Sequence, residues 1–231
     1  MRPENIGQTM RQFIPMGMPQ MIEGFLDKVD MAVDGPHLLQ AAIYSKQAEI
    51  AQLFISKGVD LTNPPNKVPP LTSDPSCHLN YRQAPFIIQA ACAGDLAVMK
   101  ALVAAGCSLT EVGHICLSKR RQNSVASNVV GAAAYWGNKE VLKYVLNRLD
   151  ADFVDVKAIE CADRTLSKSG PFKPEMHDFT PLQLALVSPH QSVDVVKLLF
   201  GKDANHGVKE AGTNNNILHL AAKHCVDTAV L

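Results

Sequence analysis

The sequence predicts an all-α fold, a solenoid of about five stacked helix pairs, from two patterns in the chain. First, a short Ala-rich stretch, a small or polar break and a second stretch with paired apolar residues recur five times. Second, the apolar pairs recur at spacings of three and four residues, which places them on one face of a helix. These pairs are Val98/Met99 with Ala101/Leu102, Val141/Leu142 with Tyr144/Val145, and Val195/Val196 with Leu198/Leu199. A single helix pair cannot cover its own apolar face, so we expect neighbouring pairs to stack.

Each repeat contributes two expected helices. Alanines in the first stretches allow two helices to approach closely, and Gly58 and Gly106 suit left-handed caps after the second stretches. The last repeat is expected to be incomplete, because its second helix would end after about one turn. We therefore expect a fragment of a longer protein, or a partner that covers this end. The expected helices lie at 39–44 and 49–54, 89–93 and 98–102, 131–136 and 140–145, 180–185 and 193–199, and 216–222 and 227–231.

Two of the first stretches resemble the signature of a known family. Thr180-Pro181-Leu182-Gln183-Leu184-Ala185 and Leu218-His219-Leu220-Ala221-Ala222 are similar to the Thr-Pro-Leu-His-x-Ala signature of the ankyrin repeat. The resemblance covers residues 35–231 and implies an ankyrin-repeat solenoid. It also implies a module that binds a protein partner through a concave groove and through the hairpin loops, or fingers, along one edge.

The repeats are spaced more widely than the family's period of about 33 residues. Equivalent positions lie 48, 43 and 54 residues apart, at Ile50, Val98, Val141 and Val195. The resemblance places the extra length in the fingers, so we expect extended fingers at 61–84, 108–126 and 151–178. Several prolines in the first of these segments oppose helix formation. Loops of this length without secondary structure tend to be functional or disordered.

Residues 1–34 form a Met-rich N-terminal segment that holds six of the eight methionines. Pro19 suits the first position of a helix, on which six apolar residues would share one face. We expect this helix to cap the first apolar face of the array; the alternative is that its methionines adapt to a partner. Residues 1–15 are expected to lie loosely on the surface. The six apolar residues are Met21, Ile22, Phe25, Leu26, Val29 and Val33.

In ankyrin repeats, the two positions after the Ala-Ala element face the groove. The aromatic residues at these positions are expected to matter most, because Tyr and Trp dominate binding hot spots. The alternative is that the long fingers fold back and cover the aromatic rings. The residues to which the resemblance assigns partner binding are Tyr44, Cys92, Ala93, Tyr135, Trp136, Lys223 and His224.

Composition argues against several other classes of protein. The chain has 22 basic and 22 acidic residues, whereas nucleic-acid binders usually carry a basic excess. No apolar run approaches the roughly 18 residues that a membrane helix needs, so no membrane insertion is expected. The N-terminus lacks the apolar stretch of a secretory signal, and we expect a cytoplasmic protein.

Motifs of catalysis and metal binding are also missing from the sequence. It contains none of the common catalytic or phosphate-binding signatures, so we expect no enzyme, no catalytic residue, no cofactor and no small-molecule substrate. The six cysteines form no Cys-x-x-Cys pair. Cys107, His114 and Cys116 lack the fourth ligand of a structural zinc site, so no metal is expected either.

Two functions follow from these expectations. The first is a protein-interaction module, an adaptor or scaffold, which includes a subunit of a larger assembly because long insertions suit permanent contacts. The second is a regulatory N-terminal ankyrin region of a longer enzyme or channel, whose active part lies beyond residue 231.

Overall fold

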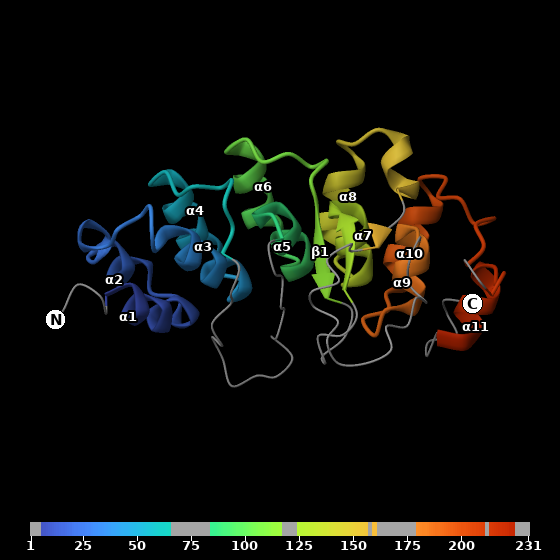
Figure 1. Cartoon of the computed structure of the whole chain (residues 1–231), viewed down its shortest axis with the longest axis horizontal. Helices are drawn as coiled ribbons and strands as arrows, with labels where there is room; N and C mark the ends of the chain where they lie inside the picture. Colours follow the sequence, from blue (N-terminus) through green and yellow to red (C-terminus); the bar gives the residue numbers. More distant parts are fainter. Residues whose placement is uncertain are drawn as a thin grey trace.

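The computed structural model describes residues 6–65, 84–116, 124–156, 159–160, 179–210 and 213–224. The described residues are mostly helical, so the prediction of a helical fold is confirmed (Figure 1). The helices are α1 (Ile6–Phe13), η2 (Ile14–Met16), α2 (Pro19–Glu23), η3 (Leu26–Lys28), α3 (Gly35–Tyr44), α4 (Ala48–Ser56), α5 (Phe86–Ala93), α6 (Leu96–Ala104), α7 (Val129–Tyr135), α8 (Lys139–Leu146), η5 (Ala151–Asp155), α9 (Pro181–Val187), α10 (Val193–Phe200) and α11 (Ile217–His224).

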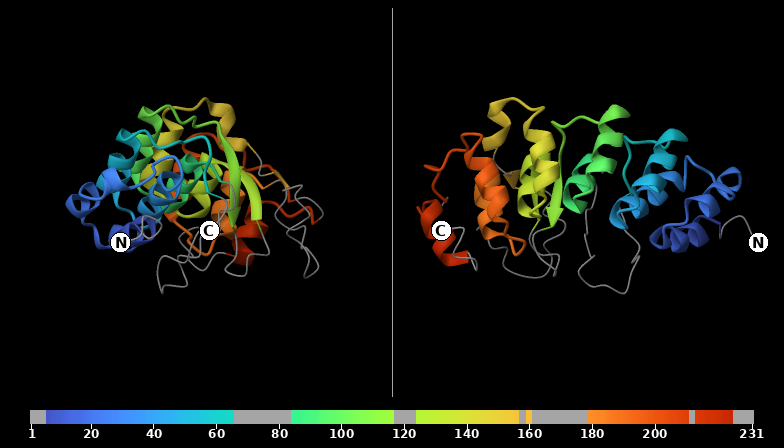
Figure 2. Two further views of the ribbon diagram at one scale, coloured as in Figure 1. Left: turned by 60° about the vertical axis from the view of Figure 1, so that its left-hand side comes forward. Right: turned by 180° about the vertical axis from the view of Figure 1, so that it is seen from behind.

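Helices α3 to α10 form pairs that follow one another along the molecule, and Figure 2 shows the same succession from behind. The two helices of each pair contact each other: α3 with α4, α5 with α6, α7 with α8, and α9 with α10. The first helices also contact their neighbours, from α3 through α5, α7 and α9 to α11. The second helices do the same from α4 through α6 and α8 to α10. The pairs therefore build two layers of helices.

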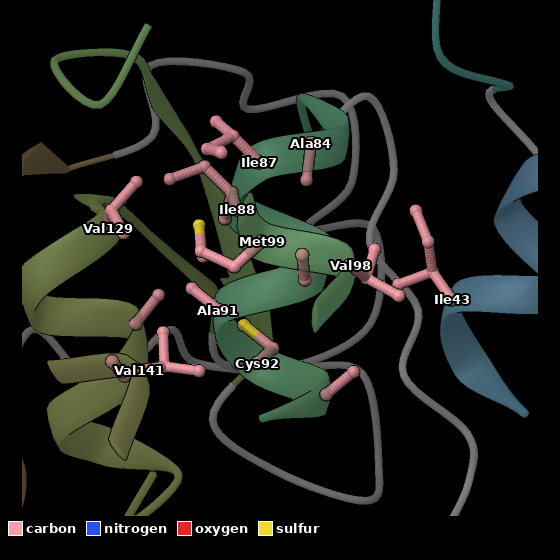
Figure 3. Packing of buried hydrophobic residues seen from close by; sticks show 14 of the residues in the cluster. Ile43, Ala84, Ile87, Ile88, Ala91, Cys92, Val98, Met99, Val129 and Val141 are labelled. Carbon is pink, nitrogen blue, oxygen red and sulfur yellow. The ribbon is translucent and has the colours of Figure 1, made fainter. Parts of the chain in front are cut away.

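The layer of first helices forms the centre of the core. Every residue of α5 and of α7 is buried, and most of these residues are small or aliphatic. Small side chains let neighbouring helices approach closely, which suits an element covered on several sides. Figure 3 shows side chains from α5 and α6 filling the space between α3 on one side and α7 and α8 on the other.

The second helices bury one face only. In α6 the buried residues are Val98, Met99 and Leu102, whereas Lys100 between them is exposed. In α8 Val141 and Val145 are buried, as the spacing of three and four residues predicts. The outward faces of these helices therefore form the exposed side of their layer.

Capping residues explain where several of the helices begin and end. The Asp95 carboxylate accepts hydrogen bonds from two backbone N–H groups in the first turn of α6, at 2.9 and 3.2 Å. Thr180 and Gln183 form a reciprocal capping box at the start of α9. Gly58 and Gly106 follow α4 and α6 with φ angles of +79° and +96°, so the predicted left-handed caps are confirmed.

A small antiparallel sheet lies against the helices. Strands β1 (Val112–Cys116) and β2 (Ser124–Asn128) pair with each other, and β3 (Ile159–Glu160) pairs with β2. A Cβ atom at Gly113 would lie only 2.6 Å from Pro85 Cδ, so β1 runs directly along the start of α5. Within the predicted finger 108–126, residues 112–116 and 124–126 therefore belong to a packed strand pair that continues to residue 128. Most of the other predicted fingers, at 66–83 and 161–178, lies outside the described residues.

The N-terminal segment differs from its prediction. Residues 6–13 form helix α1, which contacts α3, and Met10 and Ile14 are fully buried, so the expectation that residues 1–15 lie loosely is wrong for this part. Helix α2 contacts α4 but ends at Glu23.

The six apolar residues that follow Pro19 do not share one helical face. Ile22 and Leu26 are buried, whereas Met21 and Val33 are 43% and 66% exposed. The cause is the end of α2 before Gly24 and the short 3₁₀ turn after it, because a 3₁₀ turn has a different angular spacing from an α-helix.

The last described helix is α11. It corresponds to the expected first helix of the fifth repeat, at 216–222, and it contacts α9. The expected second helix at 227–231 lies outside the described residues.

Candidate functional site

Three of the seven predicted binding residues are buried. Cys92 and Ala93 at the end of α5 are 4% and 6% exposed, and Tyr135 at the end of α7 is 2% exposed. The prediction that these side chains face an open groove is therefore wrong. The reason is that α5 and α7 each have a first helix on both sides and a second helix behind, so even their last residues are covered.

Tyr44 lies at the end of α3, with its ring partly exposed and its hydroxyl oxygen buried. Burial raises the pKa of the Tyr44 phenol well above its usual value, and Cys92 of the next pair adds to this shift. The structure thus brings two of the predicted residues together across neighbouring pairs. Their contact serves the packing of α3 on α5.

Tyr135 and Trp136 belong to a contact between α7 and the turn that joins α9 to α10. The Trp136 ring stacks on His190, with centroids 4.5 Å apart and an interplanar angle of 28°. The Tyr135 ring meets Trp136 edge-on at 5.7 Å, and the Tyr135 carbonyl accepts a hydrogen bond from the Ser188 hydroxyl. The backbone N–H of His190 donates in turn to Ser188 Oγ at 2.8 Å. Trp136 is half-buried, and among the described residues its ring packs against His190 of the neighbouring pair. The alternative that a finger covers this ring concerns residues that lie mostly outside the described ranges.

Lys223 and His224 lie in the last turn of α11. Lys223 is exposed and His224 is half-buried. The backbone carbonyl of His224 accepts a hydrogen bond from Gln191 Nε2 at 2.7 Å, which ties the end of α11 to the turn before α10. The predicted residues therefore lie at successive pairs along the row and do not converge on one site. A partner-binding role for Tyr44, Trp136, Lys223 and His224 stays a prediction.

Polar residues in the breaks between paired helices connect the pairs, and sequence reasoning did not identify them. Asn138 Nδ2 donates to the carbonyls of Ala91 and Cys92, at 2.7 and 2.9 Å, across the boundary between the second and third pairs. Gln47 and Gln191 occupy similar breaks and also donate from their side-chain amides to backbone carbonyls. The sequence feature that could have identified these residues is an Asn or Gln at, or just before, the start of a second helix.

A second group that the sequence analysis missed lies on the outward face of the second helices. The guanidinium carbon of Arg148 lies 3.8 Å from the centroid of the Tyr144 ring, and Lys100 Nζ of α6 lies 5.9 Å from the same centroid. Both distances are typical of cation–π contacts. We call these three residues, Lys100, Tyr144 and Arg148, the Tyr144 cluster. Its signal was an aromatic residue and a basic residue four positions apart, with Arg148 in the turn just after α8.

An ion pair joins α8 to α10 in the same layer. Lys139 Nζ of α8 lies 2.9 Å from a carboxylate oxygen of Asp194 in α10. The hydrogen bond from Lys139 lowers the pKa of the Asp194 carboxyl, and the same bond raises the pKa of the Lys139 ammonium. Both side chains are substantially exposed, so water and salt screen the pair.

Metal-binding and nucleophilic groups are scattered. Within the described ranges, no group of three or more His, Cys, Asp or Glu side chains is placed to hold a metal ion. Burial raises the pKa of the half-buried Cys107 thiol to about 11, and Glu111 adds to the shift, so this thiol stays protonated at neutral pH. The side chains of His114 and Cys116, the other members of the weighed metal site, lie outside what the structure describes. None of the described helices is long and apolar enough to cross a bilayer.

Compared with known proteins, the chain matches no protein-family model and no curated protein. The likeness to ankyrin repeats therefore depends on the residues quoted from the sequence.

Proposed function

We propose that this chain is an ankyrin-repeat solenoid that acts as a protein-interaction module without catalysis of its own. The signature-like stretches at the starts of α9 and α11 support this proposal, as does the succession of helix pairs that contact one another in order along the chain.

The observation that carries the proposal is the difference in burial between the two layers of helices. The first helices α3, α5, α7 and α9 are buried almost throughout, whereas the second helices expose charged and polar residues on one face. Because α4, α6, α8 and α10 contact one another in order, these exposed faces form an extended surface. An extended surface built from several helices suits a protein partner, whereas small molecules usually bind in concave, mostly apolar pockets.

Cys92 and Cys107 support a module without catalysis, because both contribute to packing. Cys92 is buried beside Tyr44, and Cys107 has a raised pKa. Cys107 is a free thiol, which fits the reducing cytoplasm that we propose as the location. The contribution of the long fingers to binding stays a prediction.

Affinity capture with photocrosslinking tests the proposal. A photoreactive amino acid is placed at Lys143, on the outward face of α8, or at Lys209, which is exposed in the connection between α10 and α11. We expect a protein that crosslinks from position 143 much more than from 209, and that binds the purified chain in calorimetry. If the intact chain captures no protein beyond what an unrelated helical bait captures, the proposed function is wrong.

A further inference from the structure

Two exposed cations, Lys100 and Arg148, make up the charged part of the Tyr144 cluster. Helix α6 and residues 139–148 together hold four basic side chains and one acidic side chain, and Asp95 and Asp150 flank these two segments. Lys139 is compensated by Asp194. Lys100, Lys143 and Arg148 remain exposed, and none of them has a described carboxylate within ion-pair distance.

Arg148 is held in a fixed position on this surface. Its guanidinium stacks on the Tyr144 ring at 3.8 Å, and Nη1 lies 3.5 Å from the Tyr144 carbonyl oxygen. Stacking uses the flat face of the guanidinium and leaves N–H donors at its edge for a planar acceptor such as a carboxylate. A pre-positioned side chain loses less conformational entropy when a partner binds.

Lys100 adds a second charge close to the first. Because both cations lie close to one ring centroid, they lie within about 10 Å of each other. Alternate residues of an extended chain are about 7 Å apart and lie on the same side. This limit allows acidic residues at alternate positions of an extended segment to reach both cations, and Tyr144, which both cations approach, is a residue type favoured at binding hot spots.

We propose that the Tyr144 cluster is the docking site for an acidic, extended segment of a protein partner, with Arg148 and Lys100 each binding a carboxylate. This inference rests on the proposed function and specifies the partner's chemistry. Charge complementarity selects this occupant, because an acidic segment supplies the carboxylates that the exposed cations lack within the described structure.

Fluorescence polarisation of the full chain with labelled peptides tests the proposal. The probes are a peptide with Glu at alternate positions, its Gln analogue of equal length, and a short single-stranded DNA. We expect the Glu peptide to bind at least about tenfold more tightly than the Gln analogue. The double variant Lys100→Glu with Arg148→Glu is expected to lose at least about tenfold in affinity, because it reverses both charges.

Matched controls separate this site from a general effect of charge. Lys57→Glu reverses an exposed charge at the end of α4, outside the cluster, and is expected to stay within about twofold of the wild type. Tyr144→Leu removes the ring under Arg148 and is expected to weaken binding several-fold while both charges remain. Far-ultraviolet circular dichroism and thermal melting check that each variant is folded.

Three results would overturn the proposal: equal affinity for the Glu and Gln peptides, an equal loss in Lys57→Glu, or tighter binding of the DNA than of the Glu peptide. The double variant is also used in the capture experiment. A partner that is captured equally well by the double variant would refute this docking site and leave the proposed function intact, whereas a wild-type chain without any partner would refute the proposed function itself.

Discussion

Asn138 joins the third helix pair to the second, because its side-chain amide donates to the backbone carbonyls of Ala91 and Cys92 at the end of α5. These carbonyls belong to the last turn of a helix, where the helix itself offers no further N–H partners. The Asn138 side chain does not cap its own helix α8. One side chain thus satisfies two backbone acceptors of a neighbouring repeat.

Replacement of Asn138 by Ala is expected to lower the free energy of unfolding by about 2 kcal/mol, because two net hydrogen bonds are lost. Urea denaturation followed by circular dichroism measures the change. Asn147→Ala, at the exposed end of α8, is the matched control and should cost less than about 0.5 kcal/mol. Equal costs for the two variants would show that the bonds from Asn138 do not hold the pairs together.

Substitutions at two glycines distinguish the free-energy cost of a steric clash from the cost of a strained left-handed backbone. Gly94 and Gly106 both have positive φ angles, but a Cβ at Gly94 would lie 2.3 Å from Asn138 Oδ1, whereas a Cβ at Gly106 meets nothing within 4 Å. Gly106→Ala should cost about 1 kcal/mol from backbone strain alone. Gly94→Ala should cost about 3 kcal/mol, because the Asn138 amide must also move away from its acceptors. Thermal and urea unfolding of both variants would contradict this explanation if the two costs were the same.

Trp136 is expected to contribute more to stability than to binding. Trp136→Ala removes the ring that stacks on His190 and should cost about 2 kcal/mol of unfolding free energy, less than a fully buried Trp because the ring is half-buried. Trp136→Phe keeps an aromatic ring and should cost less. Circular dichroism measures the stability, and calorimetry with the captured partner measures the affinity. A large loss of affinity at unchanged stability would instead support the binding role predicted from the sequence.

Cys107 is expected to react slowly with alkylating reagents in the folded chain. Its pKa of about 11 lies above the usual value of about 9, because burial and Glu111 disfavour the thiolate. At pH 8 the thiolate fraction should therefore be roughly a hundredfold smaller than for an ordinary cysteine. Iodoacetamide labelling read by mass spectrometry compares the folded and urea-unfolded protein. Labelling of Cys107 at the same rate in both states would show that the folded environment does not protect the thiol.

Sequence reasoning succeeded where the signal is local. The spacing of Val141 and Val145 was enough to predict a helix and its buried face, and Gly58 and Gly106 were enough to predict two left-handed caps. It failed for residues 6–15, because the apolar residues Met10 and Ile14 are buried by contacts of α1 with α3 rather than by a long periodic pattern. It also missed the strands β1 and β2, which pair with each other while β1 packs against the start of α5.

Sequence periodicity alone determined the class of the fold and the order of the helix pairs, because helices and their caps depend on residues a few positions apart. Only the tertiary structure decided which side chains remain accessible. Tyr135 is buried, its carbonyl accepts a hydrogen bond from Ser188 of the next pair, and the Tyr144 ring lies near Lys100 of the preceding pair. Contacts between segments that lie more than 40 residues apart in the chain do not change the hydrophobic periodicity of either segment. They can therefore be identified only from the packing of the helix pairs in the tertiary structure.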